Sequence, residues 1–505
     1  MARISTTLIA FLALIILLAA VASGEHDAVA RTAQSSIAAS TAASAAGGML
    51  SFAHRLGGRW RWIIAFGACI PLAIPATAIA TALIQNPFAM DPYGPAVIIA
   101  AQAIAHLPIA FLIQAGALNS VPDDLLMASA TLGVSPGATV RRVLCRPWLR
   151  SFWVSTALTA LIIASDPSVT LVYGGTDSYL ASHIFRSMST GMTDDVGPNV
   201  AALVIPAILL AGLLSRRAGN WIDIQHKVRR RSPEFVSSQF VWRHRLLIAV
   251  VPQLIVVAAI VGTIVAGAVG ASHVASGSLI NTTLAVLIIA VPAALVCGLL
   301  TAVLAGRGGV VGFTVTAGLL ATFLLSQTAI GMMLSALFRD STSIWIVTFP
   351  SLVGGGSVAG GYVAVGIAYL TVAVPIAHVG FTVMLRSTRD LFDAARDAGA
   401  DSVRAGVTLL PVLAPQIVAV TALVSGIILT RTAPITFVQP PGFDTASTSL
   451  TALAAAGWDD RVFAMSLMTA SVAGGLLLLA VGSGVLFGRG MWSGSPRTRE
   501  TTGVA

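Results

Sequence analysis

Long apolar segments separated by short polar ones make up nearly the whole chain. Each apolar segment approaches the roughly 20 residues that one helix needs to cross a bilayer. Twelve segments meet this length, with boundaries near 7–23, 32–51, 62–84, 96–117, 151–172, 198–215, 245–268, 279–305, 309–335, 361–385, 412–432 and 463–487. The pattern predicts an all-α polytopic membrane protein with about 12 transmembrane helices.

Two of these segments have a second interpretation. The first, "TLIAFLALIILLAAVASG", follows Arg3 and ends in small residues, so it also fits a cleavable signal peptide. The span that begins at Arg245 has the same place at the head of the second half of the chain, which favours a retained anchor. The second segment, "AQSSIAASTAASAAGGML", is rich in Ala, Ser and Gly. Such a helix suits close packing against protein neighbours.

The composition excludes a soluble protein. Of the 505 residues, 56% are hydrophobic and only 10% are charged, and the mean hydropathy is +0.88. A soluble fold could not bury this much apolar surface, whereas a bilayer accepts it. The three cysteines, Cys69, Cys145 and Cys297, lie in or beside apolar segments without paired spacing. We interpret them as packing residues and expect neither a disulfide framework nor a metal site.

The basic residues predict the orientation. If both termini are cytoplasmic, the cytoplasmic segments hold 24 of the 29 Lys and Arg residues, which is a strong positive-inside bias. The basic residues left outside are Arg31, Arg186, Arg339, Arg431 and Arg461. A pI near 10.4 is also typical of nucleic-acid binding. The basic residues sit at span ends without interleaved aromatic residues, so topology explains them better and we expect no nucleic-acid partner.

Two polar islands interrupt the apolar pattern. They are "LLMASATLGVSPGATVRRVLCRP", Leu125–Pro147, and "LFDAARDAGADSVRAGVTLLP", Leu391–Pro411. Gly133 of the first island and Gly399 of the second are 266 residues apart, and the later tetrapeptides "VTLV" and "ITFV" share this offset. One ungapped repeat therefore relates the islands and the spans that follow them.

The repeat predicts two tandem six-helix halves, 1–243 and 244–505, joined by a basic linker at about 216–244. Each half carries one island between its fourth and fifth spans, near 120–150 and 387–411. Parallel repeats indicate a pseudo-two-fold axis along the membrane normal, with a transport path between the halves.

The second island has the pattern of a short helix. Ser387 is placed to cap it, and Asp390 in the first turn suits the helix dipole. Arg389 is within helical pairing distance of Asp393, as is Arg396. Gly399 stands where the helix would end. A solvated loop helix whose charges pair locally is the alternative, but two islands at one offset disfavour it.

The islands resemble the EAA loop of permease subunits from binding-protein-dependent ABC importers of the type I, MetI-like fold. The second island gives Asp393-Ala394-Ala395, then Gly399, then Leu410-Pro411, with the proline one residue early. The first gives Met127-Ala128-Ser129, then Gly133, Val143 and Pro147, with the proline one residue late. Met127 in place of the family's Glu is the main departure. The resemblance extends over essentially the whole chain as two fused permease domains.

The resemblance implies the partners. In that family each loop is a coupling helix that docks on a cytoplasmic ATPase subunit, and an extracytoplasmic binding protein delivers the substrate. The chain would then work with two copies of the ATPase in a bacterial cytoplasmic membrane. It has no GxxxxGK[ST] loop, and its only lysine is Lys227. We therefore expect no cofactor on this chain, no enzymatic site of its own, and ATP on the partner subunit.

The candidate translocation path contains two ionisable residues. Asp166, in "IIASDPSVTLVYGG", ends the fifth span of the first half, and Arg431, in "ILTRTAPITFVQPPGFDT", has almost the matching place in the second. An ionisable residue near membrane depth is a functional candidate. The alternatives are that each reaches interfacial water or that they pair with each other. Pro167, Pro434 and the turn at 440–442 would break the spans there.

The substrate signal is a single loop. "PPGFDTAS" resembles the equivalent loop of fused permeases for ferric iron and, less closely, for thiamine and aminoethylphosphonate. The resemblance therefore implies a small solute, with ferric iron first and thiamine, aminoethylphosphonate or a polyamine as alternatives.

Two other function classes remain open. A secondary, major-facilitator-like transporter also has twelve spans, but it would usually carry a GxxxD-R-x-GRR loop, and "FAHRLGGRWR" has no acid. A membrane-embedded enzyme would need clustered His, Asp or Glu at membrane depth. The eight histidines are scattered without ligand spacing, and we interpret His106 and His378, each in the fourth span of its half, as satisfied interior residues.

Overall fold

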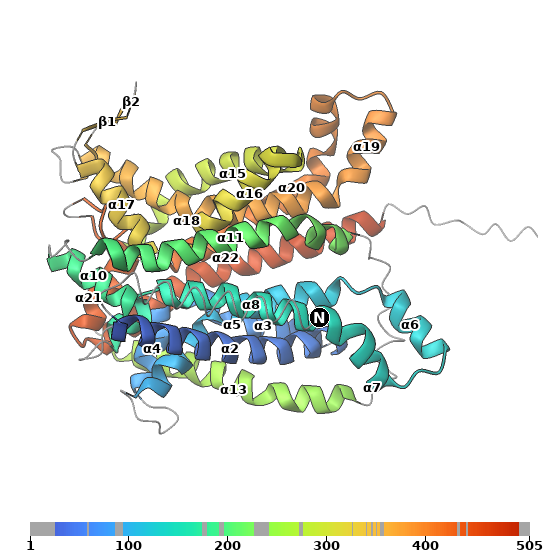
Figure 1. The fold of residues 1–505 in the computed structure, drawn as a ribbon, viewed down its shortest axis with the longest axis horizontal. Helices are drawn as coiled ribbons and strands as arrows, with labels where there is room; N and C mark the ends of the chain where they lie inside the picture. Colours follow the sequence, from blue (N-terminus) through green and yellow to red (C-terminus); the bar gives the residue numbers. More distant parts are fainter. Residues whose placement is uncertain are drawn as a thin grey trace, which may run out of the picture.

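The computed structural model is an almost entirely helical bundle whose helices run side by side along its longest axis (Figure 1). It describes residues 26–57, 60–85, 94–173, 179–190, 196–226, 242–271, 276–325, 327–339, 341–344, 347–349, 351–353, 358–431, 435–440 and 443–493. The first expected span, 7–23, and much of the expected linker, 216–244, lie outside these residues.

The helices fall into two series that follow the predicted halves. The first comprises α2 (His26–Leu56), α3 (Arg61–Ala73), α4 (Ala76–Ile84), α5 (Pro95–Asn119), α6 (Asp123–Thr131), α7 (Pro136–Thr139), the π-helix η2 (Val140–Leu144), α8 (Cys145–Ser165), α9 (Ser168–Val172), α10 (Leu180–Thr190) and α11 (Val196–His226). The second comprises α13 (Trp242–Val269), α14 (Ser276–Leu284), the π-helix η3 (Ala285–Ala290), α15 (Val291–Gly306), α16 (Gly309–Leu324), α17 (Gln327–Arg339), α18 (Val358–Ser387), α19 (Arg389–Asp397), α20 (Ser402–Leu429), α21 (Ala446–Ala455) and α22 (Asp459–Ser493). A short antiparallel hairpin, β1 (Thr342–Ile344) and β2 (Val347–Phe349), follows α17.

Eight helices in the described part of the chain are long and apolar enough to cross a membrane, and two bent helix pairs bring the number to ten. The polytopic, helical character is therefore confirmed, while the number twelve remains a prediction. Two expected spans, 62–84 and 309–335, are wrong as single helices. The first bends by 93° between α3 and α4, and the second by 101° between α16 and α17.

The first bend has a local cause. Ile74 precedes Pro75, and its φ of −100° and ψ of 129° are those of an extended residue. A residue before proline is pushed out of the helical region because the proline ring clashes with its backbone. Leu325, at the second bend, is also extended, with φ −59° and ψ 145°. Each predicted half therefore has a broken third span.

Helix α2 corresponds to the expected span 32–51 and packs as its composition predicts. Its small residues form one buried stripe at helical spacing, made of Ser36, Ala39, Ser40, Ala43 and Ser44. The stripe allows close approach to α5 and α8. At Gly47 a Cβ atom would lie 2.8 Å from the backbone nitrogen of Phe111 on α5, so only glycine fits there. The segment is not among the apolar spanning candidates.

The two series interlock. Helix α13, at the head of the second series, packs on α2, α3 and α4, whereas α11, the last of the first series, packs on α16 (Figure 1). Ile260 of α13 and Phe463 of α22 are buried in one cluster with Ile79 and Val97 of the first series. The predicted halves are thus joined by a shared apolar core.

Candidate functional site

The two islands fold into equivalent helices at the same end of the bundle (Figure 1). Helix α6 carries Met127, Ala128 and Ser129, and α19 carries Asp393, Ala394 and Ala395. Both helices contain nine residues. We call this end of the bundle the island end.

Both helices finish in the same turn. Gly133 has φ 70° and Gly399 has φ 87°, in the left-handed region that glycine enters without a Cβ penalty. The N–H of the residue after each glycine donates 3.0 Å bonds to the helix, from Val134 to the Ser129 carbonyl and from Ala400 to the Ala395 carbonyl. These are the long-range bonds of a Schellman motif. The expectation that Gly399 ends the second helix is confirmed.

One detail of the expected second island is wrong. Ser387 does not cap α19; its hydroxyl donates a 2.8 Å bond to the Met384 carbonyl, and the Thr388 hydroxyl donates to the same oxygen at 2.9 Å. Both hydroxyls add to the backbone bond from the Thr388 N–H, which donates to the Met384 carbonyl at 3.2 Å at the end of α18. The capping residue in this region is Asp401, whose carboxylate accepts the Arg404 N–H at 2.6 Å and begins α20.

Helix α6 is anchored to the first series. Arg55 at the end of α2 forms an ion pair with Asp123, the first residue of α6, and both side chains are only 9% exposed. The Arg55 guanidinium also donates a 3.0 Å bond to the Val121 carbonyl. Leu126 of α6 is buried in a cluster with Leu56, Leu118, Val121 and Leu144. The helix is therefore held firmly at its first turn.

Ser129 strengthens this anchoring. Its hydroxyl donates to the Leu126 carbonyl at 2.8 Å and accepts a 3.1 Å bond from the Thr139 hydroxyl of α7. The matching Ala395 cannot make these bonds because it has no hydroxyl. Serine in place of alanine at position 129 thus ties α6 to α7.

Helix α19 presents its surface to solvent. None of its residues is buried. Arg389 and Asp393 are 80% and 59% exposed and lie 3.8 Å apart as an i,i+4 pair, as the sequence predicts. Arg389 occupies the position that corresponds to the buried Asp123 in α6. The second island therefore lacks the anchoring ion pair of the first.

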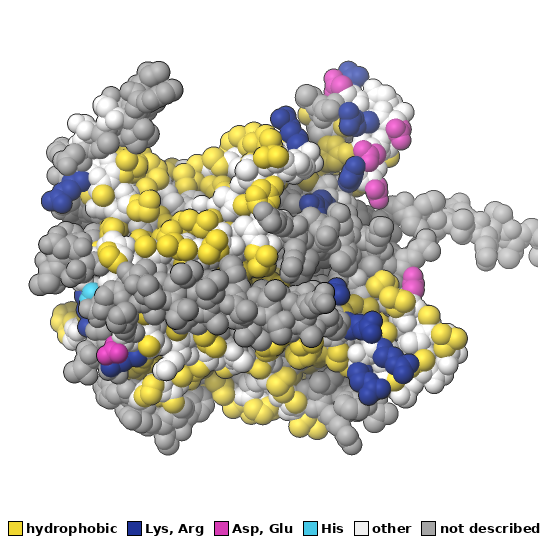
Figure 2. Space-filling model, viewed as in Figure 1, with side chains coloured by type: hydrophobic (Ala, Val, Ile, Leu, Met, Phe, Trp, Pro, Cys, Tyr) yellow, Lys and Arg dark blue, Asp and Glu magenta, His cyan; other side chains and the backbone are white. Residues whose placement is uncertain are grey.

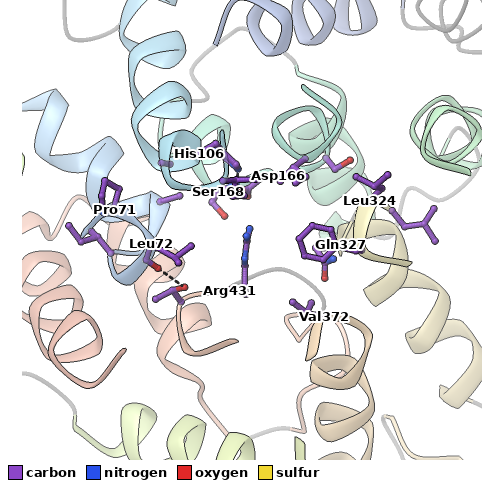
Figure 3. A pocket seen from close by; sticks show the side chains of 18 residues that line it. Pro71, Leu72, His106, Asp166, Ser168, Leu324, Gln327, Val372 and Arg431 are labelled. Carbon is purple, nitrogen blue, oxygen red and sulfur yellow. Dashed lines mark hydrogen bonds and ion pairs between the residues drawn. The ribbon is translucent and has the colours of Figure 1, made fainter. Parts of the chain in front are cut away.

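A cavity of about 70 Å³ lies between the two series, where both broken spans and both fifth spans meet (Figure 3). It is lined by Pro71, Leu72, Ile74, Ala76, Ala105, His106, Ile109, Ile162, Ser165, Asp166, Ser168, Phe323, Leu324, Leu325, Gln327, Val372, Thr430 and Arg431. One water needs roughly 10–15 Å³ of such a cavity, so this cavity has room for several waters or a small ion.

Asp166 is held at the cavity by its own loop and faces His106. Helix α8 ends at Ser165, and the Asp166 carboxylate accepts the Ser168 N–H at 2.9 Å, which starts α9. The other carboxylate oxygen lies 3.9 Å from Nε2 of His106. The His106 Nδ1 lies 2.9 Å from the Gln102 carbonyl, which can only accept, so Nδ1 carries a proton. The ring therefore donates toward Asp166 only when it is an imidazolium.

Arg431 enters the cavity from the second series and extends toward Asp166 and Ser168 (Figure 3). Its guanidinium interacts electrostatically with Asp166, but among the described residues the two form no direct ion pair. The structure thus brings both predicted path residues to one cavity, yet leaves space between them.

Two uncharged residues complete the site and were not expected from the sequence. The Thr430 hydroxyl lies 2.9 Å from the Ile427 carbonyl of its own helix and 3.4 Å from the Leu72 carbonyl at the broken end of α3, so its one proton is shared between two acceptors (Figure 3). The buried Oε1 of Gln327, at the start of α17, accepts no hydrogen bond within the part of the chain that the structure describes. The bend after α16 places Gln327 at the cavity and the bend after α3 exposes the Leu72 carbonyl, and in the sequence only Pro75 marks one of these bends.

The site lies near the middle of the bundle. His106 is eleven residues from Pro95 and thirteen from Asn119 on α5, so it is about 17 Å and about 20 Å from the two ends of that span. The sequence predicted Asp166 at the outer end of its span. Helix α8 does end at Ser165, but the Asp166 carboxylate lies against His106 near the midpoint of α5. Pro434 and the Pro441-Gly442 turn lie outside the described residues.

The remaining polar residues form no second centre. His378 is buried on α18, with Nδ1 3.2 Å from the Thr301 hydroxyl. Over the described ranges, no group of three or more His, Cys, Asp or Glu residues could hold a metal ion, and the three cysteines are free. No protein-family model, curated protein or solved structure matches the chain. The function must therefore be argued from the site itself.

Proposed function

We propose that the chain is the transmembrane permease of an ATP-driven ABC importer with two fused MetI-like halves. The observation that carries the proposal is the pair of island helices. Two nine-residue helices, 266 residues apart, end in the same Schellman turn at one end of an apolar helical bundle. Paired helices of this kind give two equivalent places at which a pair of cytoplasmic ATPase subunits can push.

The cavity supplies the other half of the mechanism. It lies between the two series at mid-depth, where both third spans are broken. Transporters built from repeats bind solutes near the midplane, at broken helices between the repeats. Closure of two ATPases would draw α6 and α19 together, and the interlocked series would then open the cavity to the opposite side of the membrane. An extracytoplasmic binding protein would deliver the solute there.

The solute is small. A cavity of about 70 Å³ holds a small ion or solute in this state, and its polar groups are a carboxylate, an imidazole, a guanidinium and an amide. Ferric iron is the first candidate from the "PPGFDTAS" loop, and thiamine, aminoethylphosphonate or a polyamine are the alternatives. The island end is cytoplasmic in this proposal, and the membrane is the bacterial cytoplasmic membrane.

The test is isolation of the chain with its partners and measurement of uptake. We expect one copy of this chain with two copies of an ATP-binding subunit, and uptake into membrane vesicles that requires ATP inside. Two copies of the chain for two ATPase subunits would contradict the fused architecture. Uptake driven by an ion gradient without ATP would favour a secondary transporter and overturn the proposal.

A further inference from the structure

Four arginines lie together where the first island joins its span. They are Arg141 and Arg142 in η2 and Arg146 and Arg150 in α8, all with exposed side chains. Arg142, Arg146 and Arg150 follow one another at four-residue spacing, which places Arg146 and Arg150 on one face of the helix. The residues 266 positions later, on α20, are Val407, Thr408, Val412 and Gln416. This arginine stripe therefore belongs to the first half alone.

The four arginines have no ion-pair partner among the residues that the structure describes. Figure 2 shows the contrast between the two islands, because dark blue side chains gather near α6 and α7 whereas blue and magenta alternate around α19. The region around the second island also has four basic residues, Arg386, Arg389, Arg396 and Arg404, but places them among aspartates. The positive-inside tendency acts on both halves, so it accounts for basic residues at both islands but not for a run of four without interleaved acids in the first half alone.

The start of the apolar part of α8 sets the depth of the stripe. No charged residue follows Arg150 on α8, and the apolar segment runs from Ser151 to Ser165. Trp148, between Arg146 and Arg150 in the sequence, packs inward, because its indole N–H donates a 2.7 Å bond to Gln114 of α5 and its ring centroid lies 5.5 Å from that of Phe52 on α2. The exposed arginines therefore lie at the end of the apolar segment, where a basic cluster attracts anionic lipid.

We propose that Arg141, Arg142, Arg146 and Arg150 form a binding site for the phosphate of anionic phospholipid head groups, on the first half only. Guanidinium groups bind phosphate oxygens in a bidentate manner, which suits a phosphodiester. All four residues belong to the continuous helical segment Gly137–Ser165, which leads from the first island into its span. A protein that docks on α6 and α19 would approach from the tips of those helices. The site does not depend on the proposed transport function.

The experiment uses the whole purified chain in nanodiscs of phosphatidylcholine with a minor fraction of phosphatidylglycerol. Native mass spectrometry counts the phosphatidylglycerol molecules retained per chain. We expect the triple variant R142Q/R146Q/R150Q to lose most of the enrichment, since each arginine near an anionic surface changes association about fivefold. The variant R389Q/R396Q/R404Q removes the same charge from the same end and should keep the enrichment. These exposed side chains can be replaced without loss of packing, and size-exclusion elution checks the fold.

A gain-of-function variant sharpens the test. V407R/T408R/V412R places arginines on exposed positions that match Arg141, Arg142 and Arg146, and it should raise the number of retained phosphatidylglycerol molecules. Equal loss in both triple variants would show a net-charge effect and overturn the proposal. So would displacement of the lipid by millimolar inorganic phosphate, which would indicate a free-phosphate site. Unchanged lipid retention with loss of a bound ATPase would assign the stripe to a protein partner and also overturn it.

Discussion

Asp166 and His106 approach to 3.9 Å between carboxylate and imidazole, although 60 residues separate them and a bent helix pair lies beside them. The contact joins the end of one span to the midpoint of another. It also fixes the boundary of the cavity that Arg431 enters from the second series. The Asp166 carboxylate and the Arg431 guanidinium therefore line one cavity and come from different series.

The Asp166→Asn variant should lower uptake at least tenfold while the chain still assembles with its partners. Asparagine keeps an oxygen that can accept the Ser168 N–H, so α9 should still form. The charge that faces His106 and Arg431 is lost. Asp460, exposed in the first turn of α22, does not line the cavity, and Asp460→Asn is the matched control. Uptake by Asp166→Asn equal to that of Asp460→Asn would show that the carboxylate merely caps α9.

The Arg431→Gln variant should lower uptake to a similar extent. Glutamine has a comparable length but no charge, so the cavity keeps its walls and loses its cation. Arg461 lies 4.2 Å over the Trp458 ring near the start of α22 and outside the cavity, which makes Arg461→Gln the matched control. Equal uptake by both variants would mean that Arg431 only reaches interfacial water.

The Asp123→Ala variant should destabilise the chain by about 3–5 kcal/mol, because it leaves the buried Arg55 without its partner. Asp124→Ala, one residue along, changes an exposed carboxylate and should cost about 0.5 kcal/mol or less. Thermal unfolding in detergent compares the two. A double variant, Arg55→Leu with Asp123→Ala, should recover part of the loss. Equal melting temperatures for Asp123→Ala and Asp124→Ala would show that the pair contributes nothing to the anchoring of α6.

The Thr430→Val variant tests the Thr430 hydroxyl at the cavity. It removes the hydroxyl that lies 2.9 Å from the Ile427 carbonyl of α20 and 3.4 Å from the Leu72 carbonyl of α3, and it keeps the shape of the side chain. The net cost of one hydrogen bond is about 1 kcal/mol, and we expect a loss of stability of that size. Thr430→Ser keeps the hydroxyl and should behave like the parent protein. Unfolding midpoints measure the difference. A serine variant as unstable as the valine variant would assign the effect to packing of the methyl group.

The sequence predicted the helical, polytopic character of the chain and the two island helices, because long apolar runs and a repeated polar pattern are local signals. It missed the two breaks because the apolar composition continues through them. Pro75 marks the first break, whereas nothing in the residues described around Leu325 marks the second. It also missed the role of His106, since its contact with Asp166 depends on how α5 packs beside the end of α8. The spacing of apolar and polar residues within one helix does not predict which residues of another helix it will contact.

The islands themselves differ more in their anchoring than in their backbone. Met127 and Ser129 replace two signature positions of the family pattern, and the structure ties α6 to its own half through Asp123 and Ser129. Helix α19 has no buried residue and carries Asp393 on its exposed surface. If both helices are docking elements, α19 offers more surface to a partner.

The Gly399→Glu variant should therefore block uptake more completely than Gly133→Glu. A Cβ atom at either glycine would meet no atom within 4 Å, so neither change creates a clash inside the chain. The positive φ costs about 1 kcal/mol, too little to unfold the bundle.

Gly457, with φ 72° and the same open space, lies between α21 and α22 away from the islands, and Gly457→Glu is the matched control. Membrane abundance, retention of the ATPase subunit and uptake are measured for all three. We expect normal abundance throughout, with lost uptake in the island variants alone. Normal uptake in all three variants would reduce the islands to solvated loops and remove the basis of the proposed function.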